Sequence, residues 1–315
     1  MTTVRHTLAQ CLLRGVVLVA PLALSGFAQA DAAPDHSIRI EAGASQFTFV
    51  DAQGDAKKRM TIHTFLPTGV KADAAPIVFV MHGKGKDAAN YRDVWARYAT
   101  QHGFMVIAPL FGDATWGGAY AGNQVFTPGG KAVDASWWSF NVIEHLFDAI
   151  KAATGNRSSR YLLYGHSEGG QFVHRLVWFL PEARFSRAVA ANPGWYTLPD
   201  LNVAFPYGLE NSPATAGSLK RSLERNLIVL LGEQDTDADH AQLRKTPQAL
   251  AQGRHRLARG QNFFKQAGER CAALNCQFGW QMKLVPGAGH SNAQMAAEAA
   301  AVLMSGPNAR AAGSK

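Results

Sequence analysis

The sequence predicts an α/β fold with a mostly parallel central sheet that is flanked by helices. Short, continuous apolar runs recur along the chain, as expected of strands covered on both faces. Stretches suited to helices lie between several of these runs, and such an alternation builds a parallel sheet. One apolar run, at residues 160–164, ends in a glycine-rich turn that leads into a helical stretch at residues 171–180. We therefore expect an open sheet with a functional turn at one of its strand ends.

The expected strands follow one another along the chain after a polar start. An antiparallel edge comes first, because residues 60–66 alternate apolar and polar side chains as a half-covered strand does. Two shorter strands, at residues 37–41 and 46–51, are expected beside it. A helix is expected at residues 88–101. The parallel strands are expected at residues 76–81, 104–108, 161–164, 187–191, 227–231 and 281–285.

Two long irregular segments, residues 111–136 and 192–225, interrupt the alternation. Each follows a strand at its C-terminal end, which is where open α/β sheets bind their ligands. Loops of this length within a compact domain are usually functional. We expect these insertions to form walls or a partial cap over the C-terminal edge of the sheet.

The first thirty residues have the composition of a secretory signal peptide. Arg5 and Arg14 precede an apolar run at residues 15–24, and Ala28-Gln29-Ala30 has the pattern of a cleavage site. A single membrane anchor is the alternative. The apolar run is shorter than the roughly 20 residues that a spanning helix needs, and it contains Pro21. The sequence therefore predicts export, with cleavage near Ala30.

The mature chain, residues 31–315, is expected to fold as a single domain, because no linker divides it. We expect it in the periplasm or outside the cell, without stable membrane insertion. It keeps Cys271 and Cys276, which are five positions apart and are predicted to form a disulfide in an exported protein. The motifs of zinc sites are missing from the sequence, so neither a metal nor another cofactor is expected.

The mature chain is basic, with a net charge of +6 once the two arginines of the leader are removed from the total of +8. Six basic residues lie in a segment, residues 244–265, that contains no Asp or Glu. We expect a solvated helix face there, or alternatively a surface that attracts an anionic substrate, polymer or envelope. Nucleic acid is not expected, because no binding motif accompanies the charge. The basic residues are Arg244, Lys245, Arg254, Arg256, Arg259 and Lys265.

The glycine-rich turn around Ser167 has the pattern G-x-S-x-G of a nucleophile elbow, a tight turn between a strand and a helix. Without Cβ atoms, Gly165 and Gly169 let two backbones approach while the serine is held at the sheet edge. A purely structural turn is the alternative in a chain with thirty glycines. The strand before the turn and the helix after it favour Ser167 as a nucleophile.

An acid and a histidine follow Ser167 in the order that a serine triad on this scaffold requires. Asp235 stands three positions after the glycine that ends an apolar strand, and it is the expected acid. Asp237 is the competing acid, and an Asx turn is the structural alternative. His290 lies in a glycine loop between the last strand and the last helix, and it is the expected general base.

His82-Gly83, directly after the strand at residues 76–81, has the pattern of an oxyanion loop. The backbone N–H groups of Lys84 and Glu168 are the expected donors to a tetrahedral oxyanion. Each donor lost would cost on the order of 3 kcal/mol of transition-state stabilisation. Because the donors are backbone groups, both side chains are free for other roles.

These landmarks resemble the α/β-hydrolase superfamily across nearly the whole mature chain. The leader, the His166-Ser167 elbow and the pair Trp137-Trp138 are similar to secreted polyhydroxybutyrate depolymerase-like and feruloyl-type esterases. Secreted polyaspartate hydrolases are also similar in layout, and the basic segment would suit their anionic substrate. The landmarks are His82-Gly83, Gly165 to Gly169, Asp235 and His290.

The resemblance implies a secreted serine hydrolase that cleaves carboxylic esters, small or polymeric, through an acyl-enzyme and without a cofactor or metal. His290 would take the proton of Ser167, and Asp235 would support the imidazolium. One alternative is a hydrolase of amides or of an anionic polymer such as polyaspartate. A catalytically silent binding module, a lyase and a cofactor-free haloperoxidase are further uses of the same scaffold.

Aromatic residues are concentrated in or beside the two insertions. They could present flat surfaces to an aromatic or polymeric acyl group, whereas packing within their own loops is the alternative. The candidates for substrate contact are Trp137, Trp138, Trp195 and Tyr196.

Overall fold

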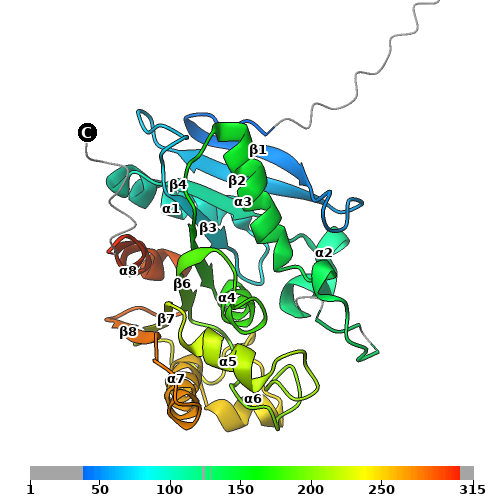
Figure 1. Cartoon of the computed structure of the whole chain (residues 1–315). Coiled ribbons are helices and arrows are strands. Elements are labelled where there is room, and N and C mark those ends of the chain that lie inside the picture. Colours follow the sequence, from blue (N-terminus) through cyan, green and yellow to red (C-terminus); the bar gives the residue numbers. More distant parts are fainter. Residues whose placement is uncertain (1–37, 123–124, 128, 306–315) are drawn as a thin grey trace, which may run out of the picture. The chain divides into compact units, whose positions relative to one another are not determined.

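The computed structural model describes residues 38–122, 125–127 and 129–305, which lie within one compact unit, His36–Lys315. Its centre is an eight-stranded sheet in the order β1-β2-β4-β3-β5-β6-β7-β8 (Figure 1). The strands are β1 (Gly43–Val50), β2 (Arg59–Leu66), β3 (Ile77–Met81), β4 (Met105–Pro109), β5 (Tyr161–His166), β6 (Phe185–Ala191), β7 (Leu227–Gly232) and β8 (Gln281–Val285). The predicted signal peptide lies outside the described residues.

The sheet is parallel except at one edge, where β1 pairs with β2 and β2 with β4 in antiparallel fashion. This confirms the predicted α/β class with a mostly parallel sheet. The helices are α1 (Ala88–His102), α2 (Asp113–Gly122), α3 (Asn141–Thr154), α4 (Glu168–Phe179), α5 (Ala216–Leu223), α6 (Pro247–Gln252), α7 (Arg256–Ala273) and α8 (Asn292–Met304), with a short 3-10 helix at Ala135–Trp137.

Helices cover both faces of the sheet, and each face has its own apolar core (Figure 1). In β3, Ile77, Phe79 and Met81 belong to the core shared with α3, α4 and α7. Val78 and Val80 point to the other face and belong to the core shared with α1 and α8. The continuous apolar runs of the sequence therefore form strands that are buried on both sides.

The antiparallel edge differs from the sequence-based prediction in one respect. The strand expected at 37–41 does not form over residues 38–41, and residue 37 lies outside the described part. The register explains this, because β1 alone pairs with the full length of β2, from Gly43 opposite Leu66 to Val50 opposite Arg59. Since β4 occupies the other side of β2, an earlier strand has no free partner there.

Three further features of the described residues bear on the sequence analysis. Cys271, at the end of α7, is joined to Cys276 by a disulfide, with 5.1 Å between their Cα atoms. In the described part of the chain, every helix is too short or too polar to pass through a bilayer. The two insertions are not wholly irregular, since α2 lies in the first and α5 in the second.

The turn after β5 is held by backbone packing that leaves no room for side chains. A Cβ atom on Gly165 would overlap the backbone carbonyl of Gly169, the second residue of α4. A Cβ atom on Gly169 would overlap the carbonyl oxygen of Met81 at the end of β3. Strand β5, helix α4 and strand β3 therefore meet backbone to backbone beneath the turn.

We predict that Gly165→Ala lowers the free energy of unfolding by about 3 kcal/mol or more, because neighbouring main chain must move to admit the methyl group. Gly268→Ala is the matched control, since that glycine lies inside α7 and its Cβ would meet only an ordinary contact at 3.8 Å from Phe278. It should be neutral or stabilising by up to about 1 kcal/mol. Urea unfolding followed by circular dichroism measures both, and equal midpoints for the two variants would contradict this packing account.

Candidate active site

Ser167 stands at the junction of β5 and α4 in a backbone conformation that side chains rarely adopt, with φ 58° and ψ −114°. Such a conformation costs on the order of 1–3 kcal/mol and persists only where the surroundings enforce it. The glycine contacts beneath the turn enforce it here, and the Ser167 N–H donates to the carbonyl of Ala191 at 2.9 Å. The sharp turn places the hydroxyl at the C-terminal edge of the sheet.

His290 lies between Ser167 and Asp235 in a continuous chain of hydrogen bonds. Its Nε2 is 3.0 Å from the Ser167 hydroxyl oxygen, and its Nδ1 is 2.8 Å from Oδ2 of Asp235. A carboxylate only accepts, so the neutral imidazole donates from Nδ1 and Nε2 accepts from the serine hydroxyl. The structure brings together the three residues that the sequence singled out from three separate strand ends.

The competing acid, Asp237, has a different environment. Its side chain is exposed, and Oδ1 accepts from the backbone N–H of Asp239 at 2.8 Å, which is an Asx turn. Asp235 is buried, and its own N–H donates to the carbonyl of Gly232 at the end of β7. The position three residues beyond the strand is therefore the one that faces His290.

A buried asparagine that the sequence analysis did not single out joins the two loops that carry the acid and the histidine. Asn192 follows β6 directly; its Nδ2 donates to the carbonyl of Gly289 at 3.1 Å, and its Oδ1 accepts from the N–H of Gly232 at 2.8 Å. Its backbone is left-handed, with φ 46°, which Asn tolerates better than most residues. Its position directly after a strand was the only feature of the sequence that pointed to a role at the site.

Asp235 has a second partner, the guanidinium group of Arg256, which is the first residue of α7. Nη1 of Arg256 lies 3.5 Å from Oδ1 of Asp235, and both side chains are buried. Burial lowers the pKa of Arg256, while the attraction of Asp235 opposes that shift. The two oxygens of the carboxylate are thus divided between Arg256 and His290, which fixes the orientation of the carboxylate.

The basic segment of the sequence does not form one solvated face. Arg256 is buried against Asp235, and Arg259 is buried with its guanidinium donating to the carbonyls of Gly253, Gly194 and Arg244. Lys245 and Lys265 each pair with a nearby acid, at 3.3 and 3.7 Å. These four basic residues therefore make contacts within the chain, and Arg256 is the one that contacts Asp235. Attraction of an anionic substrate stays a prediction.

The predicted oxyanion loop lies beside Ser167. A Cβ atom on Gly83 would stand 3.5 Å from the Cβ of Ser167. The N–H of Lys86 donates to the carbonyl of Gly83 at 3.1 Å and closes a turn that contains Lys84, whose side chain is exposed. The backbone of Lys84 is thus held by a local turn next to the serine.

The neutral side chain of His82 holds this loop in place through two hydrogen bonds. Its Nδ1 donates to the carbonyl of Gly83 at 2.9 Å, and its Nε2 accepts from the backbone N–H of Phe111 at 3.0 Å. Burial lowers the pKa of His82 to about 4, which keeps the ring uncharged near neutral pH. The structural role of His82 explains why it is no competitor of His290.

His166, the residue before Ser167, is also buried and neutral. Burial lowers its pKa well below the ordinary value, and the proximity of His290 and of the Arg256 guanidinium acts in the same direction. A hydrogen bond of 3.0 Å joins its Nδ1 to the hydroxyl of Tyr91, and its ring centre is 4.8 Å from that of His290. The imidazole of His290 therefore rests on an uncharged aromatic surface.

The aromatic candidates for substrate contact lie in different surroundings. Trp138 is buried against Phe179, with ring centres 5.6 Å apart. Tyr196 is fully buried and stacks on Phe263 at 4.3 Å. These contacts favour packing as the role of Trp138 and Tyr196.

Trp195 is also buried, and two guanidinium groups lie close to its ring. The centres of the Arg175 and Arg244 guanidinium groups are 4.5 and 4.6 Å from its ring. Packing is therefore also the favoured role of Trp195. Trp137 is 52% exposed. Of the four candidates for substrate contact, it alone is open to solvent.

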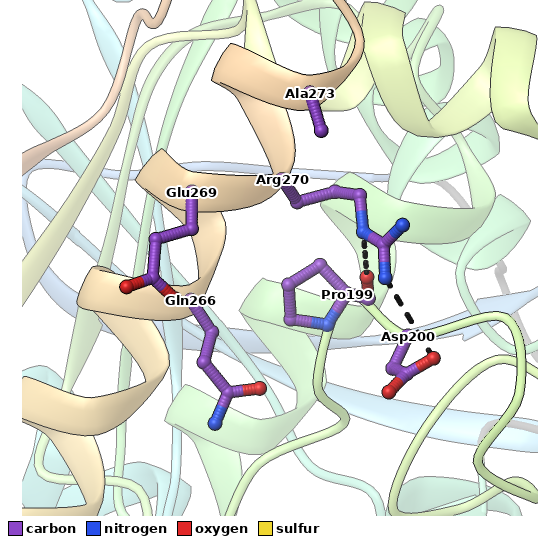
Figure 2. A pocket seen from close by; sticks show the side chains of 6 residues that line it. All are labelled: Pro199, Asp200, Gln266, Glu269, Arg270 and Ala273. Carbon is purple, nitrogen blue, oxygen red and sulfur yellow. Dashed lines mark hydrogen bonds and ion pairs between the residues drawn. The ribbon is translucent and has the colours of Figure 1, made fainter.

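A surface pocket is formed by the loop at residues 199–200 and one side of α7 (Figure 2). Arg270 crosses it, donating from Nε to the carbonyl of Pro199 at 2.9 Å and lying 3.7 Å from Asp200. Its lining contains none of the predicted site residues. The lining residues are Pro199, Asp200, Gln266, Glu269, Arg270 and Ala273.

Among the residues that the structure describes, no group of His, Cys, Asp and Glu side chains is arranged to hold a metal ion.

A strand-end serine that is hydrogen-bonded to histidine and aspartate on an open α/β sheet is the arrangement of hydrolytic enzymes. The structure is similar to that of poly(aspartic acid) hydrolase-1 from Sphingomonas sp. KT-1, with 41% identity, a TM-score of 0.81 and coverage of 84% of this chain and 99% of that one. It is also similar to the poly(3-hydroxybutyrate) depolymerase LpqC from Bordetella parapertussis, with 36% identity, a TM-score of 0.78 and coverage of 83% and 90%.

The S-formylglutathione hydrolase from Agrobacterium tumefaciens shares the fold at 18% identity and a TM-score of 0.56, over 87% of this chain and 98% of that one. No protein-family model matches the chain, and no curated relative matches it. The likeness to the first two structures is strong enough to assign the family. The chain belongs to the α/β-hydrolase superfamily, as a hydrolase of the serine esterase and depolymerase type.

We predict that Asp235→Asn lowers kcat for an activated ester by about 10³- to 10⁴-fold, because an amide cannot orient the imidazole as the carboxylate does. Asp237→Asn is the matched control and should keep kcat within about twofold, since its carboxylate accepts only from the local backbone. Steady-state kinetics on both variants test the assignment. A greater loss in Asp237→Asn than in Asp235→Asn would reverse it.

Proposed function

We propose that this protein is an exported serine hydrolase that cleaves carboxylic esters by way of an acyl-enzyme. The observation that carries the proposal is the hydrogen-bonded chain from Ser167 through His290 to buried Asp235, beside the loop at residues 82–86. The composition of residues 1–30 and the disulfide between Cys271 and Cys276 support export.

The proposed reaction follows from the hydrogen bonds of the site. Oγ of Ser167 attacks the acyl carbon as Nε2 of His290 takes its proton, and Asp235 stabilises the imidazolium. The carbonyl oxygen becomes an oxyanion that accepts from the N–H groups of Lys84 and Glu168. The C–O bond then breaks, and the leaving alcohol takes the proton from His290. Water repeats the steps on the acyl-enzyme and releases the acid.

A second candidate substrate is polyaspartate, an anionic polymer with amide bonds. It is supported by the 41% identity to a poly(aspartic acid) hydrolase. Lys84, on the loop beside Ser167, and Arg244 are exposed basic residues whose positive charge would attract a carboxylate. A polyester is supported in the same way by the 36% identity to a poly(3-hydroxybutyrate) depolymerase.

We predict that the mature protein hydrolyses p-nitrophenyl acetate and butyrate, and that Ser167→Ala and His290→Ala each lower kcat by about 10⁴-fold or more. Alanine fits where the small serine stood, so the fold should be retained. A fluorophosphonate should label the wild type at Ser167 and leave Ser167→Ala unlabelled. Turnover that survives in Ser167→Ala would refute the assignment.

The same protein should then be tested on poly(3-hydroxybutyrate), on a feruloyl ester and on polyaspartate, with release of acid as the readout. Activity on polyaspartate that falls steeply with salt would favour the anionic polymer, because screening weakens attraction between exposed charges. Activity on poly(3-hydroxybutyrate) that does not depend on salt in this way would favour a polyester as the substrate.

A further inference from the structure

We propose that the ion pair between Lys86 and Glu168 positions the two backbone donors of the oxyanion site. Both would be positioning residues for the hydrolysis proposed above, on which this inference rests. Nζ of Lys86 lies 2.9 Å from Oε2 of Glu168, and the two side chains are only 15% and 14% exposed. The pair joins two segments that are 82 positions apart in the sequence.

Each partner belongs to one half of the oxyanion site. Glu168 directly follows Ser167, begins α4 and carries one of the two donor N–H groups. Lys86 closes the turn that contains Lys84, which carries the other. A bond between these two side chains therefore ties together the main-chain segments whose separation determines whether one oxygen atom can accept from both donors.

Lys86 is itself held in place. Its backbone is left-handed, with φ 54°, and its ammonium group lies 4.5 Å from the centre of the Tyr120 ring. The hydroxyl of fully buried Tyr120 donates to the carbonyl of His82 at 2.6 Å. Asp113 is 3.9 Å from the ammonium group, but it is 78% exposed, so solvent screens it. Lys86 is thus fixed between the oxyanion loop, the first insertion and the start of α4.

Glu168 is suited to this role by its place on the helix. A carboxylate in the first turn of a helix interacts favourably with the unpaired N–H groups there. With little solvent around it, the pair is screened less than an exposed one would be. The ion pair is therefore stable before a substrate arrives, and oxyanion donors are effective when they are fixed in advance.

The alternative is an ion pair that contributes only to stability, as many do. The chain provides a matched control in Lys283 and Glu298, which form a pair of the same length, 2.9 Å, between β8 and α8. That pair is more exposed, at 45% and 37%, and neither residue belongs to the site. Substitution there reports the loss of one ion pair without a change in the oxyanion donors.

The test compares Lys86→Met, Glu168→Gln and the double variant with Lys283→Met in the mature protein. The substrate is p-nitrophenyl butyrate, and the transition-state probe is an alkyl trifluoromethyl ketone. The hydroxyl of Ser167 adds to its carbonyl carbon, the serine proton passes to His290, and the carbonyl oxygen becomes an oxyanion. Binding of the ketone therefore reports on the donors directly.

We expect Lys86→Met and Glu168→Gln each to lower kcat by about 30-fold, less than the 10²- to 10³-fold typical of a donor removed outright. KM should stay within about twofold, and Ki for the ketone should rise by the same factor as kcat/KM falls. The double variant should be little worse than either single one, because the two residues act as one unit. Lys86→Arg should restore most of the activity, and Lys283→Met should leave it unchanged.

The proposal is overturned if Lys86→Met and Glu168→Gln behave like Lys283→Met, if their effects multiply in the double variant, or if the loss appears in KM alone. Thermal unfolding of each variant separates a lost fold from a lost alignment, and Glu168→Gln provides the test if Lys86→Met does not fold. A wild type that neither turns over the ester nor reacts with a fluorophosphonate overturns this proposal and the proposed function together. An active wild type with unaffected pair variants overturns this proposal alone.

Discussion

The close approach of three backbones beneath Ser167 is the constraint on which the rest of the site depends. Gly165, Gly169 and the end of β3 occupy space that a single methyl group would fill. This packing holds Ser167 in its unfavourable left-handed conformation and turns the chain from strand to helix within one residue. The same contact brings the loop after β3 beside Ser167, so the proposed nucleophile and the proposed oxyanion loop are positioned by the same packing.

Buried polar contacts then align the loops that a parallel sheet merely brings to one edge. Asn192 joins the acid and histidine loops, and Arg256 orients Asp235 from the opposite side to His290. Lys86 and Glu168 connect the oxyanion loop to α4. Charges with little solvent around them are costly unless they are paired. Buried Asp235 and Arg256, and half-buried Lys86 and Glu168, each have a partner in another segment of the chain. The polar groups thus add the alignment that backbone topology alone does not supply.

The sequence predicted those parts of the site that local patterns encode. The elbow, the oxyanion loop, Asp235 and His290 each follow a recognisable strand end, and the structure brings them to the same edge. The partners of these residues were not predictable, because Arg256 meets Asp235 only through the packing of α7, and Lys86 meets Glu168 across 82 positions. The strand expected at residues 37–41 failed for a similar reason, since pairing along β2 is decided by register rather than by local pattern.

A crystal structure of the fluorophosphonate adduct would test most directly the claim that Ser167 faces a preformed oxyanion site. Our account predicts phosphorus bonded to Oγ of Ser167, with one phosphoryl oxygen about 3 Å from the backbone nitrogens of both Lys84 and Glu168. His290 should stay hydrogen-bonded to Asp235. A phosphoryl oxygen beyond the reach of both nitrogens, or an adduct on another residue, would contradict it.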